Sequence, residues 1–207
     1  MTVIDRATWP RREIYDFFAP MSDPFYALTF PVDVTALRRV CKSRGLPFYA
    51  ALVYGVTKAM ERVDAFLYKD RDGVIVKHER LVPSFTDLRP GSETFHIVTL
   101  EAGDSLEEFC RAAKAKSAAQ KCFIANGEWD ADELVYFSCL PWFPVTGFKN
   151  ERNADPGDSV PRVTWGRWRD EGGAVTLDLS LELNHRLLDG VHVGRFYDEL
   201  TGWINGL

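Results

Sequence analysis

One histidine stands at a point in the sequence where it can act as a base. His185 follows an alternating apolar run and precedes Asp189 and Gly190 in the stretch LNHRLLDGVH, residues 183–192. A neutral imidazole has a pKa of about 6.5, so it can accept a proton at neutral pH. The aspartate four residues on can hold the ring in one tautomer, and the glycine permits a tight backbone. This spacing predicts general base chemistry at His185.

The same histidine also fits a structural role. Residues 174–184 alternate apolar and polar side chains, which predicts a strand with one buried face. Continuing that alternation puts His185 on the apolar side, next to Leu183, where a histidine is more often a hydrogen-bonded core residue than a catalyst. Its place at a strand end favours the base, because reactive groups gather there. We expect the other three histidines, His78, His96 and His192, to be packing residues or simply exposed.

Composition limits the classes of protein that the chain can belong to. The 207 residues are 46% hydrophobic and 13% aromatic, enough for one sizeable core. A net charge of −5 argues against nucleic acid as the main partner. No apolar run approaches the length of a membrane span, and the N-terminus is charged where a signal peptide is apolar. We therefore expect one domain over residues 1–207, soluble and cytoplasmic.

The cysteines predict neither a metal site nor a disulfide framework. They are scattered, with no CxxC pair and no histidine at metal-ligand spacing. We expect small buried hydrophobes in a reducing compartment at all four positions: Cys41, Cys110, Cys122 and Cys139.

The order of expected elements mixes strands with helices. Helices are predicted over residues 35–44, 47–63, 105–121 and 189–206, the first ending at Gly45 and the third capped by Asp104 or Ser105. Strands are predicted over residues 26–33, 94–102 and 133–140, with hairpins over 65–78 and 160–184, the second turning at RDEGG, residues 169–173. This order indicates an α/β domain whose mixed, mostly antiparallel sheet is covered by helices.

Five segments resemble the chloramphenicol acetyltransferases, in order and at similar spacing. They are WPRREIYDFF, FYAALVYGVTKAM, SCLPWF, PRVTWGRW and NHRLLDGVHVGRFYDEL, and together they extend over essentially the whole chain. The H-x-x-x-D-G pattern alone is shared with dihydrolipoyl acyltransferase domains and peptide-synthetase condensation domains, but the other segments favour the acetyltransferases. The resemblance implies a two-layer α/β fold, a homotrimer with active sites between subunits, and acetyl-CoA as co-substrate with no tightly bound cofactor.

The resemblance also implies roles for named residues. His185 becomes the base that deprotonates the acceptor hydroxyl, and Ser138 hydrogen-bonds the oxyanion of the tetrahedral intermediate. Thr164 assists through a bound water. Asp189 pairs with Arg11 in an ion pair that holds the shape of the site, instead of completing a serine-protease-like triad.

Binding residues follow from the same resemblance. Phe18 falls where an aromatic ring packs on the catalytic histidine. The acceptor is expected to contact Phe17, Phe18, Phe148, Asn150 and Arg162. Acetyl-CoA is expected to contact Tyr49, Arg167 and Trp168.

The sequence departs from the family pattern at several positions. Asn184 replaces the first of two adjacent histidines, and Pro47 replaces a lysine associated with the CoA phosphate. Asn150 and Arg162 stand where the family is bulky and apolar, and Asp158 where an aromatic residue is expected. Three functions stay open on this basis: acetylation of chloramphenicol or a related small alcohol, acyl transfer to a more polar acceptor, and a non-catalytic ligand-binding trimer.

Overall fold

A seven-stranded sheet forms the centre of the computed structural model, which describes residues 1–125, 127, 129–153, 155 and 157–207. The strand order is β2-β10-β8-β7-β5-β6, with β9 paired to β10. Their bounds are β2 Phe25–Asp33, β5 Val82–Leu88, β6 Phe95–Thr99, β7 Leu134–Leu140, β8 Arg162–Gly166, β9 Arg169–Glu171 and β10 Ala174–Asn184. Strand β10 pairs antiparallel with β2, β8 and β9, while β7 pairs parallel with β5 and β8. The predicted mixed, mostly antiparallel sheet is confirmed.

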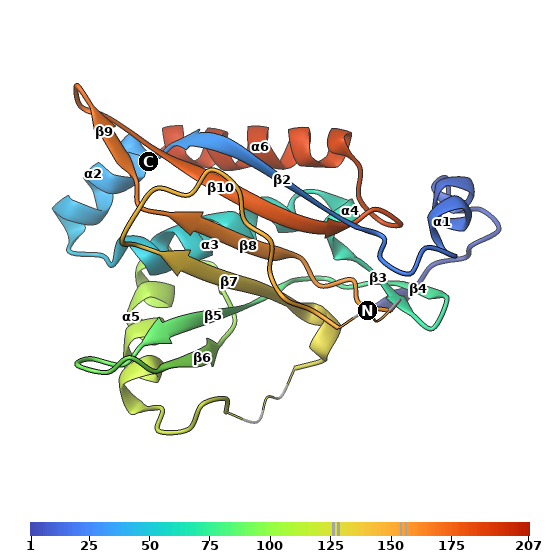
Figure 1. Ribbon diagram of the computed structural model, residues 1–207, viewed down its shortest axis with the longest axis horizontal. Coiled ribbons are helices and arrows are strands. Elements are labelled where there is room, and N and C mark those ends of the chain that lie inside the picture. Colours follow the sequence, from blue (N-terminus) through green and yellow to red (C-terminus); the bar gives the residue numbers. More distant parts are fainter. Residues whose placement is uncertain (126, 128, 154, 156) are drawn as a thin grey trace.

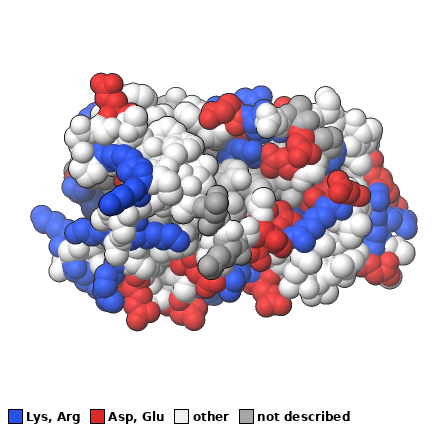
Figure 2. Space-filling view, turned by 90° about the horizontal axis from the view of Figure 1, so that it is seen from below, with Lys and Arg blue, Asp and Glu red and all other residues white. Residues whose placement is uncertain are grey.

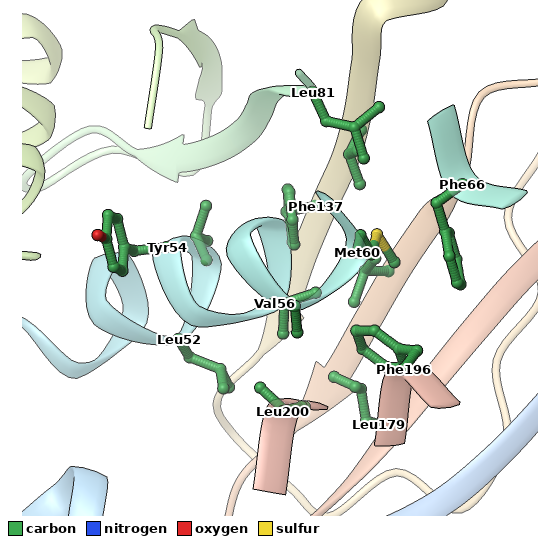
Figure 3. Close-up of a cluster of buried hydrophobic side chains, with 14 of the residues drawn as sticks. Leu52, Tyr54, Val56, Met60, Phe66, Leu81, Phe137, Leu179, Phe196 and Leu200 are labelled. Atoms are coloured by element: carbon green, nitrogen blue, oxygen red, sulfur yellow. The ribbon is translucent and has the colours of Figure 1, made fainter. Parts of the chain in front are cut away.

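Helices cover one side of this sheet (Figure 1). The helical elements are α1 Arg12–Phe18, α2 Thr35–Arg44, α3 Phe48–Glu61, α4 Asp64–Leu67, α5 Leu106–Ala119, α6 Gly190–Asn205 and a short 3-10 turn, Ala131–Glu133. Helix α3 is apolar on nearly every side because α2, α5, α6 and the sheet all pack against it. Figure 3 shows this core, where Val56 and Met60 of α3 lie near Phe196 and Leu200 of α6.

Helix ends follow the sequence signals in most places. Helix α2 ends at Gly45, which adopts the left-handed conformation with φ 64°. Ser105 caps α5 by accepting a hydrogen bond from the Glu108 amide at 3.3 Å. Gly55 of α3 is required by packing, because a Cβ there would lie 2.0 Å from the Trp203 ring of α6. The two-layer packing of helices on sheet therefore rests on close contact between α3 and α6.

The two faces of the sheet differ in character. The odd-numbered side chains of β10, from Val175 to Leu183, are buried towards the helices, as the alternation predicts. The even-numbered ones point to the opposite side, named here the open face. Segment 143–150 crosses part of this face so closely that a Cβ on Gly166 would lie 2.5 Å from the Val145 amide nitrogen. Glu182 and Asn184 are consequently buried as well, which the alternation did not predict.

Three local expectations need correction. Residues 64–67 form the short helix α4 instead of strand, so the first hairpin is limited to β3 Tyr68–Arg71 and β4 Val74–Lys77, which join β1 Thr2–Val3 in a small second sheet. In the second hairpin only Gly172 and Gly173 turn, because RDE forms strand β9. Cys122 is exposed, whereas Cys41 and Cys110 are buried and Cys139 is partly buried.

Among the described residues, no helix is both long enough and apolar enough to cross a bilayer.

Candidate active site

His185 lies in the tight turn that joins β10 to α6. Strand β10 ends at Asn184, and the His185 amide donates to the Pro24 carbonyl at 2.8 Å. Helix α6 begins at Gly190, so Asp189 is the residue that precedes the helix and does not share a helical turn with His185. The Asp189 amide donates to Nδ1 of His192 at 2.9 Å, which gives His192 a defined role in closing the turn.

The imidazole of His185 is oriented by two aromatic rings and remains accessible. The Phe18 ring stacks on it at 4.2 Å between centroids with an interplanar angle of 24°, and Tyr26 lies at 4.6 Å. The His185 side chain is 36% exposed, in contrast to the fully buried Leu183 two residues earlier. Because β10 ends at Asn184, the in-and-out alternation of the strand does not extend to His185, and its side chain is not placed in the core. Packing therefore orients this ring without burying it.

Arg11 binds the turn at both ends. Its guanidinium donates to the carbonyls of His185 at 2.7 Å and Arg186 at 2.8 Å. It also forms a bidentate pair with the Asp189 carboxylate, with one hydrogen bond of 2.8 Å to Oδ1 and a second to Oδ2. Hydrogen bonding to Arg11 holds the pKa of Asp189 below its usual range.

The charged Asp189 carboxylate also approaches the histidine. Its Oδ1 lies 3.2 Å from Nε2 of His185. At this distance an imidazolium formed by proton transfer is stabilised by the neighbouring negative charge. The pair of Arg11 and Asp189 thus both shapes the turn and provides the counter-charge for its histidine.

Arg186 is a site residue that sequence reasoning missed. Its side chain is buried and donates to the carbonyls at the end of α1, those of Phe18 at 3.4 Å, Met21 at 3.3 Å and Ala19. These are carbonyls that a helix end leaves without intrahelical partners. Because Phe18 is the last residue of α1, Arg186 fixes the ring that stacks on His185. The sequence signal was weak, because Arg186 is one of several polar residues in this turn.

A buried acid extends this support. Nη1 of Arg186 lies 3.6 Å from Oδ2 of Asp70, which is in β3. The same oxygen accepts a hydrogen bond of 2.6 Å from the Tyr15 hydroxyl of α1. Burial, together with this hydrogen bond to Asp70, raises the pKa of Tyr15 to about 12, so the phenol stays a donor. Helix α1 is therefore held at its middle as well as at its end.

Ser138 and Thr164 lie side by side but far from His185. They are paired in register between β7 and β8, and Thr164 is paired with Ser180 of β10. His185 is five residues beyond Ser180, about 16 Å along the strand, and Ser138 is two strands away. A single chain therefore does not bring Ser138 and His185 together. The Thr164 hydroxyl is buried, and it has no hydrogen-bond partner among the described residues.

The polar residues expected at the acceptor pocket are held by their own chain. Asn150 Nδ2 donates to Glu182 Oε1 at 2.8 Å. Arg162 donates to Asp158 Oδ2 at 2.7 Å, and Asn184 Nδ2 donates to the Asp158 carbonyl at 2.8 Å. These contacts form a partly buried charged network on the open face. The sequence could not show that Arg162 and Asp158 satisfy each other.

The apolar residues expected near the acceptor lie in two places. Phe17 is 67% exposed and meets the edge of Phe18 at 5.1 Å. Phe148 is half-buried in the segment that crosses the open face. Phe17 therefore lies beside the histidine, and Phe148 belongs to the other region of the site.

The residues expected to contact acetyl-CoA lie around the end of β8 and the start of α3. The Tyr49 hydroxyl donates to the Thr86 carbonyl at 2.9 Å, and burial raises the pKa of Tyr49. The Trp168 ring packs on Phe48 at 5.2 Å, whereas Arg167 is exposed. Tyr49 is thus fixed by the core, while Arg167 and Trp168 border the surface.

Solved structures of acyltransferases share this fold. A solved chloramphenicol acetyltransferase superimposes with a TM-score of 0.87 at 20% identity, covering 98% of this chain and 99% of that chain. The cubic core of the pyruvate dehydrogenase multienzyme complex superimposes with a TM-score of 0.65 at 17% identity, covering 93% and 87%. These likenesses show the fold alone.

Sequence comparison then narrows the class to one family. The family model described as chloramphenicol acetyltransferase matches residues 1–201, so the chain belongs to the chloramphenicol acetyltransferase family. It is 27% identical to chloramphenicol acetyltransferase 2 of Escherichia coli over 96% of this chain and 94% of that protein. It is also 27% identical to the chloramphenicol acetyltransferase of Clostridium perfringens, over 98% and 97%. The predicted family and fold are confirmed.

Proposed function

We propose that the chain is an acetyl-CoA-dependent O-acetyltransferase that acts on chloramphenicol or a related small alcohol. The observation that carries this proposal is the accessible His185 imidazole, stacked on Phe18 and clamped through the pair of Arg11 and Asp189. Membership of the family supports the same activity. Acetyl-CoA serves as co-substrate, no tightly bound cofactor is needed, and the single domain of residues 1–207 works in the cytoplasm.

The proposed reaction uses His185 as the base. The imidazole takes the proton of the acceptor hydroxyl as its oxygen attacks the thioester carbonyl, which forms the new C–O bond. The resulting imidazolium is stabilised by Asp189 at 3.2 Å. When the tetrahedral intermediate collapses, the C–S bond breaks and the departing sulfur of CoA receives the proton from His185. Each turnover therefore returns the histidine to its neutral form.

In this proposal, Ser138 and Thr164 stabilise the tetrahedral intermediate. The Ser138 hydroxyl donates to the oxyanion, a contribution of about 3–4 kcal/mol to transition-state stabilisation for donors of this kind. The buried Thr164 hydroxyl requires a polar partner, because an unpaired buried hydroxyl is costly. A bound water between Thr164 and the substrate satisfies this requirement.

The working unit is proposed to be a homotrimer with sites between subunits. Ser138 and His185 act on the same intermediate, yet their register within one chain keeps them far apart. A second copy that supplies Ser138 to the His185 of its neighbour resolves this separation. Exposed aromatic side chains on or beside the open face support burial by another subunit: Tyr136, Trp142 and Phe143.

The activity is tested by thiol release from acetyl-CoA, with and without chloramphenicol. Release that depends on chloramphenicol is expected, together with mass-spectrometric detection of the acetylated product. Release with other alcohols but not with chloramphenicol shifts the acceptor class. No thiol release with any acceptor would contradict the proposed enzymatic activity and favour a ligand-binding trimer.

The shared site is tested by mixing two inactive variants. His185→Ala and Ser138→Ala are each expected to be strongly impaired as pure proteins. Co-expressed at equal levels they should regain about a quarter of wild-type activity, because a quarter of the interfaces then pair two intact residues. Activity no higher than the sum of the two pure variants would show that the residues do not meet between subunits.

The charged network on the open face favours a second candidate acceptor. Arg162, Asp158 and Glu182 occupy positions that line the acceptor side in the proposed trimer, and all three are at least partly buried. Chloramphenicol, which carries a nitrophenyl ring and a dichloroacetyl group, gains little from such a lining. An acceptor with several hydroxyl or amino groups can pair with it, so the acceptor screen includes polyhydroxylated amines.

A further inference from the structure

A groove separates α2 from the β9–β10 hairpin at one end of the molecule. Its volume is about 630 Å³. It is lined by Thr35, Arg38, Arg39, Lys42, Ser43, Asp170, Gly173 and Val175. Three of these eight residues are cations that project from one helix. The two hydroxyl groups are engaged within the chain, because Ser43 Oγ donates to the Val40 carbonyl at 3.0 Å and Thr35 Oγ1 accepts from the Val175 amide at 2.8 Å. The cations are therefore the groups that can bind phosphate oxygens.

The three cations lack carboxylate partners in the part of the chain that the structure describes. None of Arg38, Arg39 and Lys42 takes part in an ion pair there. In contrast, Arg44 on the same helix is paired with Glu107 at 2.6 Å. Figure 2, which views the molecule from the side of α5 and β6, shows further Lys and Arg side chains at the left end, the end at which Figure 1 also places α2. The net charge of the chain is nevertheless −5.

The helix dipole does not account for this cluster. Cations in the last turn of a helix neutralise its negative end, which explains Lys42 and Arg44. Arg38 and Arg39 lie in the first half of α2, where positive charge opposes the dipole. The acid that lines the groove, Asp170, lies in β9 and accepts a hydrogen bond of 3.1 Å from the Gly173 amide in the hairpin turn.

Arg38 connects the groove to the region proposed to bind acetyl-CoA. Its guanidinium lies over the Trp168 ring, 4.4 Å from the centroid. Trp168 is four residues beyond Thr164, which corresponds to at most about 13 Å along the chain. A pantetheine arm, which separates the thioester of acetyl-CoA from its pyrophosphate, spans a distance of this order. The groove is therefore within reach of the phosphates of a CoA molecule whose thioester lies at Ser138 and Thr164.

We propose that Arg38, Arg39 and Lys42 form the phosphate-binding site for acetyl-CoA in this chain, with Arg38 held in place by Trp168. The assignment rests on the proposed acetyltransferase function. The ligand chemistry is an organic phosphate, and CoA offers two sources of it: the 3′-phosphate and the pyrophosphate. Guanidinium groups bind either source in bidentate fashion.

The test measures binding of CoA by calorimetry and acetyl-CoA kinetics in the full chain. The variants are Arg38→Gln, Arg39→Gln and Lys42→Gln, singly and together. In the triple variant we expect the Kd for CoA and the KM for acetyl-CoA to rise at least tenfold, while kcat changes little. The salt dependence of log Kd should become shallower, because fewer charged contacts remain to be screened. Arg44→Gln on the same helix is the matched control and should retain the wild-type Kd.

Dephospho-CoA separates the two sources of phosphate. If the groove binds the 3′-phosphate, wild type binds dephospho-CoA more weakly than CoA, and the triple variant loses that preference. If it binds the pyrophosphate, the triple variant weakens both ligands equally. An unchanged Kd for CoA in the triple variant, with wild type active, overturns the groove assignment alone. Wild type that binds CoA but acetylates nothing overturns the proposed function and leaves the groove assignment standing.

Discussion

The turn at His185 and the groove beside α2 use charged residues in opposite ways. In the turn, Arg11 and Asp189 are satisfied by each other and by backbone carbonyls. In the groove, Arg38, Arg39 and Lys42 have no carboxylate partner in the described part of the chain. The paired charges hold the turn that carries His185, whereas the unpaired cations stay available to a charged ligand. In the proposed enzyme we expect the paired residues to affect kcat and the unpaired ones to affect CoA binding.

The largest expected effect comes from removing the reactive ring itself. His185→Ala should lower kcat by about 10²–10⁴-fold, the range for loss of a general base. The melting temperature should change little, because the side chain is one-third exposed and the turn is held by Arg11. Steady-state kinetics and thermal unfolding on the same preparation check both statements. Wild-type turnover in this variant would contradict the mechanism.

Arg11→Ala should damage stability and activity together. The variant leaves Asp189 partly buried without its cation and frees the carbonyls of His185 and Arg186. The expected loss in the free energy of unfolding is about 3–5 kcal/mol, as for other broken buried pairs. Urea unfolding measures it, and Arg12→Ala, one residue along at an exposed position, is the matched control. Loss of activity with full stability would mean that Arg11 contacts substrate instead of Asp189.

The sequence was sufficient to predict structural features that depend on neighbouring residues alone. Gly45 ends α2 because it takes a left-handed conformation, and the alternation of β10 followed from which side chains are apolar. The contact of Arg11 with Asp189 joins residues 178 positions apart, so no spacing predicts it and only the resemblance implied it. Arg186 was missed because its partners are backbone carbonyls at the end of α1. Every residue has a backbone carbonyl, so no residue type in the sequence marks such a partner.

The open face shows a second limit of sequence reasoning. The alternation predicts one buried face and one polar face for β10, with Ser180, Glu182 and Asn184 on the polar face. They are buried because segment 143–150 and its neighbours cross that face, and the polar groups are paired there. Polarity alone does not distinguish an exposed side chain from a buried one with a partner.

Replacing the stacking ring should have a moderate effect. Phe18→Leu keeps an apolar side chain at the end of α1 but removes the stack on His185. Aromatic pairs contribute about 0.5–1.5 kcal/mol beyond burial, which corresponds to a fall in kcat of about two- to tenfold. Phe95→Leu, the same change at an exposed position of β6 away from the turn, is the matched control for kcat. An equal fall in both variants would show that the stack does not orient the ring.

The smallest expected effect is a change in how stability depends on pH. Hydrogen bonding to Arg11 lowers the pKa of Asp189 in the folded state, so its stabilising contribution is fully present above the unfolded value of about 3.9. As pH falls through the lower folded-state pKa, that contribution is lost. The difference in unfolding free energy between wild type and Asp189→Asn should therefore be largest near pH 6 and shrink below about pH 4. Urea unfolding across this range measures it, with Asp198→Asn in α6 as control. A difference that stays constant with pH would mean that the charge of Asp189 contributes nothing to the clamp, and that its hydrogen bonds alone hold the turn.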